Sequence, residues 1–172
     1  MAEPDEVDEI VAAWQRERPD LDVEPLQVLS RLDRLAGVLG ELRAAVFARH
    51  GLRRHEFDVL AALRRAGRPF ELTAGELAAR THVTSGTMTS RLDGLTVRGL
   101  VLRSPDREDG RLVRVTLTPA GQELVDAAFA ELIAAERDLL APLGGAARST
   151  LAANLRTLLA TATSDPAERM GT

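Results

Sequence analysis

The sequence predicts a mainly α-helical protein with a small β-wing, and three observations support this fold class. Apolar residues recur at helical spacing along most of the 172 residues. A short helix, a tight turn and a second helix follow one another within residues 74–97. A charged β-hairpin comes directly after them, with its turn at residues 104–110. This order predicts a winged helix-turn-helix with N- and C-terminal dimerisation helices around it.

We expect four segments in the chain. Residues 1–52 hold an extra N-terminal helix and a dimerisation helix, and residues 53–118 form the winged helix-turn-helix lobe that would bind DNA. Residues 119–164 form the C-terminal dimerisation helices, and residues 165–172 form a flexible tail. The long helices carry apolar stripes wider than one small lobe can cover, so a partner subunit is expected.

The N-terminal segment is predicted to form two helices. Residues 5–17 place four apolar side chains on one helical stripe, Val7, Ile10, Val11 and Trp14. This helix ends before Pro19, because the residue that precedes a proline is disfavoured in the α region. Residues 24–49 form the second helix, and Gly51 ends it. Its wide apolar face contains Leu29, Leu32, Leu35, Leu39, Leu42 and Val46.

The lobe is predicted from its capping residues. A third helix begins near Arg54, and residues 70–72 are a short extended piece. Thr73 is followed three residues later by Glu76, the pattern of a capping box at the start of a helix over residues 74–80. Thr84 caps the next helix, which Gly99 ends. The apolar residues of that helix follow at i, i+4 and i+7: Met88, Leu92 and Leu95.

The end of the lobe is predicted as a hairpin that leads into a long helix. Residues 100–103 form one strand, and residues 111–117 alternate between apolar and polar side chains as a half-buried strand does. Thr118 followed by Pro119 is an N-cap with proline at the first helical position, so a helix runs from there to about residue 140. A last helix carries Leu151, Leu155, Leu158 and Leu159.

Charge is distributed unevenly along an acidic chain. All 22 basic residues are arginine, and the net charge is −4. Residues 53–118 contain twelve arginines and eight acidic residues, so this lobe carries +4 and the rest of the chain −8. The local patch sets the field that a phosphate experiences, so the basic lobe is suited to nucleic acid in spite of the total.

Several classes of site and location are disfavoured. The absence of cysteine excludes disulfides, thiolate nucleophiles and cysteine-based zinc sites. No acidic arrangement around His50, His55 or His82 makes a metal site, and we expect neither metal nor cofactor. No run approaches the roughly 18 apolar residues of a membrane span, and the N-terminus is acidic where a secretory signal would be basic. We expect a cytoplasmic protein without a membrane partner.

The helix after Thr84 has the composition of a DNA recognition helix. Its apolar side faces the lobe, which leaves small hydroxyl residues and one arginine to meet phosphates or base edges in the major groove. The positive helix N-terminus adds attraction for phosphate. The predicted contacts are Ser85, Thr87, Thr89, Ser90 and Arg91. A plain polar surface helix is the alternative interpretation.

The hairpin turn adds Arg107 and Arg111, with three acids among them. An arginine at the tip of a wing can enter the minor groove, where negative potential is concentrated. The neighbouring carboxylates can fix its direction through charge-assisted hydrogen bonds. The alternative is a solvated turn whose charges compensate one another.

Residues 25–160 resemble the MarR family of bacterial regulators, most specifically at residues 106–111 and 117–121. The family pattern in the wing has Asp followed by two basic residues, whereas this chain has Asp109, Gly110 and Arg111. Arg111 therefore keeps the second basic position, and Gly110 is expected to weaken affinity or loosen the wing. The resemblance implies a dimer with interlocked terminal helices that represses from a palindromic site near its own promoter.

The chain also resembles the urate-responsive, PecS-like subgroup of this family at four positions. These are Trp14, Asp58, Arg91 and Arg103. The resemblance implies that they bind urate or a related anionic purine. An indole stacks on a planar base with about 1–3 kcal/mol, and a guanidinium binds an anionic edge in bidentate fashion. Asp58, repelled by the arriving anion, would pull on the recognition helix through Arg91, and Arg103 would hold or receive Asp58.

Each of these positions has a plainer interpretation. Trp14 can pack the first helix onto the body, Asp58 can be solvated, Arg91 can contact phosphate alone, and Arg103 can be a strand charge. A phenolic or antibiotic-like effector, bound between the dimer helices and the lobe, is the alternative ligand. An enzyme is disfavoured because phosphate loops, nucleophile elbows and histidine metal motifs are missing. A sequence-independent architectural DNA protein and a protein-interaction adaptor are the other rivals.

Overall fold

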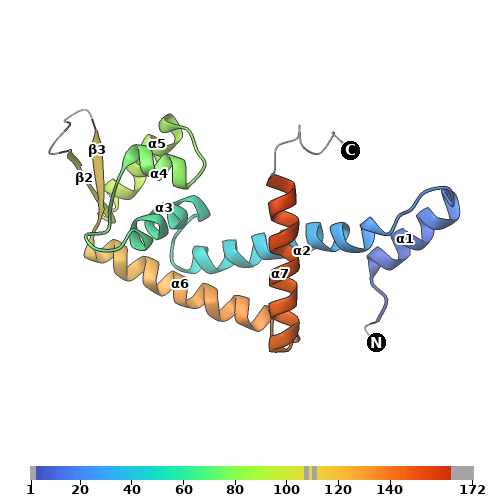
Figure 1. The fold of residues 1–172 in the computed structure, drawn as a ribbon. Coiled ribbons are helices and arrows are strands. Elements are labelled where there is room, and N and C mark those ends of the chain that lie inside the picture. The colour runs from blue at the N-terminus through green and yellow to red at the C-terminus, as the bar shows by residue number, and fades with distance from the viewer. Residues whose placement is uncertain (1–2, 107–108, 110–111, 164–172) are drawn as a thin grey trace. The chain divides into compact units, whose positions relative to one another are not determined.

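The computed structural model describes residues 3–106, 109 and 112–163 and divides into two compact units, Met1–Phe129 and Ala130–Thr172. Helices form most of it, together with one three-stranded antiparallel sheet (Figure 1). The predicted fold class is confirmed. The tail predicted at residues 165–172, and the wing residues Arg107 and Arg111, lie outside the described residues.

The N-terminal arm consists of α1 (Glu6–Glu17) packed on α2 (Pro25–Arg49). Asp5 caps α1 by accepting hydrogen bonds from the backbone N–H groups of Val7 and Asp8. Val7 and Val11 are buried, as their place on one helical stripe predicts. Proline at the first position of α2 fits a helix start, because that N–H has no helical partner to lose.

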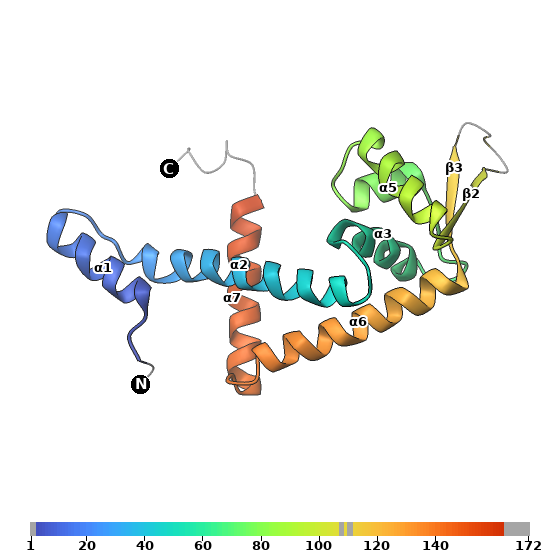
Figure 2. The ribbon, with the colours of Figure 1, turned by 180° about the vertical axis from the view of Figure 1, so that it is seen from behind.

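The lobe contains three helices and the sheet. The helices are α3 (Arg54–Arg65), α4 (Ala74–Arg80) and α5 (Ser85–Val97). Thr73 forms the predicted capping box with Glu76 at α4, and Thr84 caps α5 through the N–H of Thr87. Both predicted helix starts are therefore confirmed. Seen from behind, α5 lies beside the strands of the wing (Figure 2), in agreement with its contacts to β2.

The strands are β1 (Glu71–Thr73), β2 (Val101–Pro105) and β3 (Val113–Leu117), in the order β1-β3-β2. The predicted hairpin is confirmed, and β1 adds to its other side, with Leu72 opposite Val115. The sequence predicted a short extended piece at residues 70–72 and no pairing partner for it. Its three residues are too short to show a two-residue period, and the pairing spans more than forty residues.

One apolar core connects these elements. Most fully buried side chains come from α3, α4, α5 and the sheet, and Val7 of α1, Val46 of α2 and Val125 of α6 are also fully buried. The ring of Phe47 at the end of α2 stacks on Phe57 of α3 with centroids 4.2 Å apart. This stack fixes α3 against the end of the N-terminal arm. The largest buried side chains of the lobe are Leu60, Leu63, Leu77, Met88, Leu92, Leu95, Val101 and Val115.

Helix α6 (Pro119–Leu139) begins in close contact with the start of β2. The hydroxyl of Thr118 donates to the carbonyl oxygen of Gly99 (2.8 Å) and accepts from the N–H of Gly121 (3.0 Å). A Cβ on Gly121 would lie 2.1 Å from the carbonyl oxygen of Leu100 and 2.9 Å from Leu117. Only glycine fits there, so the first turn of α6 is seated directly on the sheet.

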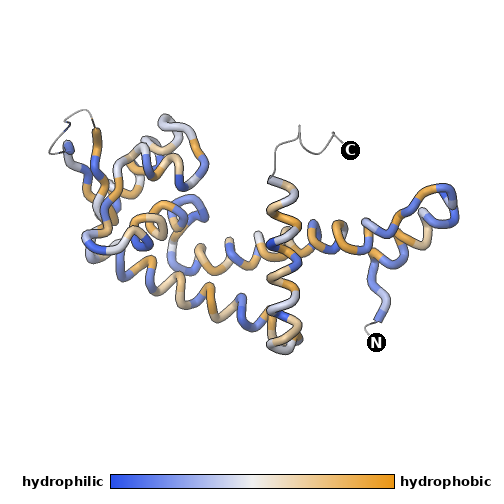
Figure 3. The backbone as a smooth tube through the Cα atoms, viewed as in Figure 1, coloured by the Kyte–Doolittle hydropathy of each residue, from blue (hydrophilic) through white to orange (hydrophobic). Residues whose placement is uncertain are grey.

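The second unit contains the end of α6 and helix α7 (Gly145–Thr163). Arg148 closes the turn between them by donating to the carbonyl oxygens of Leu140 and Leu143. No residue of α7 is buried, although apolar and polar residues alternate along it (Figure 3). The helix therefore presents apolar side chains that one chain alone leaves uncovered. In the described part of the chain, no helix is long and apolar enough to cross a bilayer.

Candidate DNA interface and effector site

Helix α5 presents its polar side to solvent. Met88, Leu92 and Leu95 are buried, as their spacing predicts. The four hydroxyl residues that we expect to contact DNA are exposed, and Arg91 is partly exposed: Ser85, Thr87, Thr89, Ser90 and Arg91. Their contacts with DNA stay a prediction, and the geometry leaves this side of the helix open for it.

The hydroxyls of this face are not equivalent. Thr87 shares a hydrogen bond with the hydroxyl of Thr84 (3.0 Å), and Thr89 donates to the carbonyl oxygen of Ser85 (3.0 Å). Within the described residues, the hydroxyls of Ser85 and Ser90 have no such partner. These two can donate to DNA without breaking a bond of the helix.

A charged network holds the base of the wing. The carboxylate of Asp106, whose side chain is 5% exposed, accepts from Nε of Arg114 and from the N–H of Asp109 (3.0 Å). Arg114 also pairs with Glu71 of β1 (3.1 Å), which in turn accepts from Thr116 (2.8 Å). Hydrogen bonding to Asp106 raises the pKa of Arg114 above its ordinary value.

This network joins β1, β3 and the wing turn, and the sequence analysis did not assign it. The expected orientation of Arg107 and Arg111 by the wing acids falls on residues outside the described part of the chain and stays a prediction, and Asp106 also binds Arg114 of β3. The available signal was the polar side of the alternating strand, where Arg114 lies between two apolar neighbours. Its partners could not be chosen from the sequence, because Glu71 is 43 residues away.

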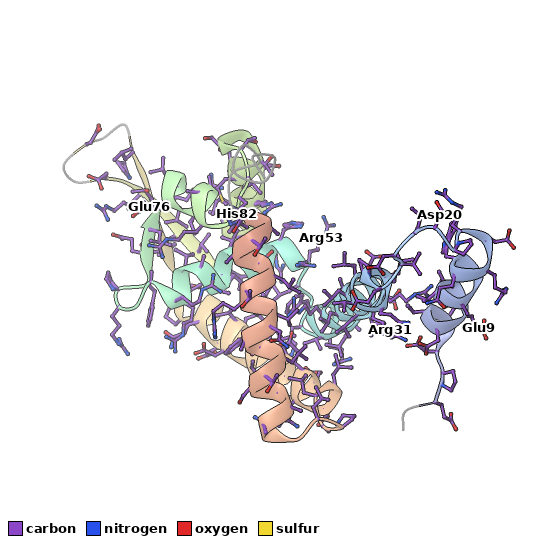
Figure 4. The ribbon with its side chains drawn as sticks, turned by 45° about the vertical axis from the view of Figure 1, so that its right-hand side comes forward. Glu9, Asp20, Arg31, Arg53, Glu76 and His82 are labelled. Atoms are coloured by element: carbon purple, nitrogen blue, oxygen red, sulfur yellow. The ribbon has the colours of Figure 1, made fainter. Side chains whose placement is uncertain are left out.

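The extra helix α1 is attached to α2 by ion pairs. Arg31 of α2 binds Asp5 through two nitrogens (both 2.8 Å) and Asp8 through one (2.9 Å), and Figure 4 shows it where α1 lies against α2. The hydrogen bond to Arg31 holds the pKa of Asp5 below its ordinary value. Trp14, farther along α1, is 50% exposed. Its half-exposed side chain therefore stands on a helix that ion pairs anchor to α2.

The other predicted effector residues lie on three elements: Asp58 on α3, Arg91 on α5 and Arg103 on β2. Asp58 is partly exposed and has no ion pair or side-chain hydrogen bond in the described residues. Arg103 pairs with Asp93 of α5 (2.9 Å) and donates to the carbonyl oxygen of Thr89 (3.3 Å). Arg103 thus binds the recognition helix and not Asp58, because β2 packs beside α5.

No hydrogen bond or ion pair joins any two of the four predicted effector residues in the part of the chain that is described. The Nε atom of Arg103 is buried without a hydrogen-bond partner. A separate cavity of about 330 Å³ lies between α3 and the first half of α6. The ion pair of Arg64 with Asp126 (2.8 Å) borders it, and its apolar lining is Phe57, Ala61, Val125 and Phe129. The described residues include no group of three side chains suited to a metal ion.

Comparison with known proteins identifies this arrangement. The model of the MarR family matches residues 50–112. The HTH-type transcriptional regulator PecS of Dickeya dadantii (strain 3937) is 37% identical over 150 residues, which cover 87% of this chain and 90% of that protein. The chain belongs to the MarR family. It is a DNA-binding transcriptional regulator similar to PecS, and the resemblance seen in the sequence is confirmed.

Two further comparisons agree. The HTH-type transcriptional repressor YetL of Bacillus subtilis (strain 168) is 32% identical over 103 residues, 60% of this chain and 61% of that protein. The crystal structure of wild-type MarR from E. coli in its apo form has 27% identity and a TM-score of 0.64, covering 76% of this chain and 96% of that one. The winged helix-turn-helix fold is therefore shared with a solved member of the family.

Proposed function

We propose that this MarR-family protein is a homodimeric repressor that binds a palindromic operator and is released by urate or a related anionic purine. The observation that carries the effector proposal is the joint presence of Trp14, Asp58, Arg91 and Arg103 in a chain 37% identical to PecS. We expect the protein to act in the cytoplasm and without a cofactor.

The dimer is supported by apolar side chains that the single chain leaves exposed. They lie on helices α2, α6 and α7, which are the helices expected to interlock. Covering such faces against a second copy is favourable by about 25 cal/mol for each Å² removed from water. A two-fold dimer would read two half-sites, which explains a palindromic operator. The exposed residues are Leu29, Leu35, Val38, Phe129, Ile133, Leu151, Leu158 and Leu159.

The effector proposal is supported by the state of the four side chains. Trp14 is half exposed and so accessible for stacking, and within the described residues the Asp58 carboxylate has no ion pair. An arriving anion would repel Asp58, whereas the guanidinium of Arg91 would attract it. Arg91 lies on the recognition helix, so a ligand that binds the DNA-free form more tightly must weaken DNA binding by the same factor.

The test is fluorescence anisotropy of a labelled duplex from the DNA upstream of the protein's own gene, titrated with urate at fixed salt. We expect tight binding that urate releases, and loss of that release in Trp14→Ala and Asp58→Asn with DNA affinity retained. Arg16→Gln on the same helix as Trp14 is the matched control and should respond as the wild type does. Tight DNA binding that urate leaves unchanged would refute the proposed urate response but not the assignment as a DNA-binding regulator.

The cavity between α3 and α6 favours a second candidate, a phenolic or antibiotic-like effector. Its apolar walls and the guanidinium of Arg65, which also lines it, suit an aromatic anion. Salicylate in the same titration distinguishes the two ligands. Release by salicylate that Phe129→Ala reduces, together with no response to urate, would favour this candidate.

A further inference from the structure

An open groove lies between the start of α3 and the exposed side of α5. Its volume is about 400 Å³. Residues of both helices line it: Arg53, His55, Glu56, Thr87, Ser90, Arg91 and Gly94. We infer that this groove binds a backbone phosphate of the operator, and that Arg53 is a DNA contact on α3 which acts together with Arg91 on α5.

The groove carries two arginines that form no ion pair in the part of the chain that the structure describes. Its one acid, Glu56, accepts from the N–H of Arg53 (2.8 Å) through one oxygen and pairs with Arg98 (3.0 Å) through the other. The guanidinium groups of Arg53 and Arg91 have no ion pair within the described residues. The carboxylate is therefore already bound, and two positive groups remain available to an anion from outside.

The remaining lining fits a phosphate. Thr87 and Ser90 contribute hydroxyls beside the two guanidinium groups, and charge-assisted bonds from arginine to phosphate are among the strongest hydrogen bonds in proteins. Gly94 has open space where a side chain would stand, with nothing within 4 Å of a Cβ placed there. No side chain therefore fills the groove at Gly94, and this leaves room there for a sugar–phosphate backbone.

Position decides that the phosphate belongs to DNA. The groove shares Thr87, Ser90 and Arg91 with the face of α5 that we expect to enter the major groove. The walls of a major groove are two phosphate backbones, so a cationic groove beside an inserted helix meets one of them. Figure 4 labels Arg53, which directly precedes α3. This phosphate contact rests on the proposed binding of DNA by the lobe and does not depend on the effector.

The test is the salt dependence of DNA binding by the full-length protein, measured with its own upstream duplex and a scrambled duplex of equal length. For Arg53→Gln we expect the slope of log K against log[salt] to fall by about 0.9 for each protomer bound, and affinity at 0.1 M salt to fall roughly tenfold. Both duplexes should be affected alike, because a phosphate contact carries no sequence information.

Two variants separate charge from structure. Arg53→Lys keeps the cation and should retain most of the slope. Arg68→Gln removes one positive charge from the loop after the C-terminal end of α3, away from the groove, and should leave the salt slope unchanged. An unchanged salt slope in Arg53→Gln would overturn the inference, although the protein would still be a DNA-binding regulator. The inference would also fail if Arg53→Gln weakened the binding of inorganic phosphate but left DNA binding unchanged. Failure of the wild type to bind either duplex would overturn DNA binding itself.

Discussion

The close contact between Gly121, in the first turn of α6, and the backbone of Leu100 allows a specific prediction about stability. Gly121→Ala places a methyl group 2.1 Å from the carbonyl oxygen of Leu100, where a normal contact needs well over 3 Å. The second neighbour is Leu117, at 2.9 Å. The first of these is backbone, which cannot rotate away as a side chain can. The helix must therefore move by about an ångström relative to β2.

The magnitude follows from opposing contributions. Overpacking of this kind costs about 1–3 kcal/mol, and loss of one of the Thr118 hydrogen bonds adds about 1 kcal/mol. Alanine regains about 0.5–1 kcal/mol through helix propensity. We expect the free energy of unfolding to fall by about 2 kcal/mol, which lowers the melting temperature by roughly 4–8 °C in a chain of this size.

The assay is thermal unfolding followed by circular dichroism at fixed protein concentration, since dimerisation would make the melting temperature depend on concentration. Gly75→Ala is the matched control. It lies exposed in α4, has only the distant hydroxyl of Thr73 near a Cβ (4.0 Å), and should be neutral or slightly stabilising. Gly121→Ala as stable as the wild type would refute the reasoning.

Three other perturbations test the charged clusters. Asp106→Asn removes the negative charge that holds Arg114 at the base of the wing. We expect it to lower the free energy of unfolding by about 1 kcal/mol and to weaken operator binding. A substitution of an exposed residue outside the lobe should change neither quantity. The bond to Arg31 lowers the pKa of Asp5 from 3.8, so its contribution to the attachment of α1 is complete above that pH and lost as pH falls below it. Trp14 fluorescence should follow this change, and Arg31→Gln should abolish it. Glu56→Gln should tighten binding to both duplexes severalfold by removing the one acid of the α3–α5 groove, and weaker binding would contradict that account.

Local patterns in the sequence were sufficient for the helices. Thr73, Thr84 and Thr118 each stand directly before a helix, and their caps depend only on residues two or three positions away. The buried side of α5 follows from the spacing of Met88 and Leu92. These features could be predicted because the interacting groups are neighbours in the chain.

The parts of the site that could not be predicted depend on distant partners. Arg103 finds Asp93 only because β2 lies beside α5, and the α3–α5 groove exists only once Arg53 stands opposite Arg91. The sequence contains many arginines, and their sequence positions alone do not distinguish their roles. Which of them is neutralised by an acid, and which remains available to DNA, is decided by tertiary packing.

The bond between Arg103 and Asp93 bears on the operators that we propose this protein reads. It joins β2, the strand that leads to the wing, with the recognition helix α5. A base pair inserted between the bases read in the major groove and the neighbouring minor groove shifts one relative to the other by about 3.4 Å and a tenth of a helical turn. Because the Arg103–Asp93 pair holds β2 beside α5, we expect such an insertion within a half-site to weaken binding more than a change of a single base pair does.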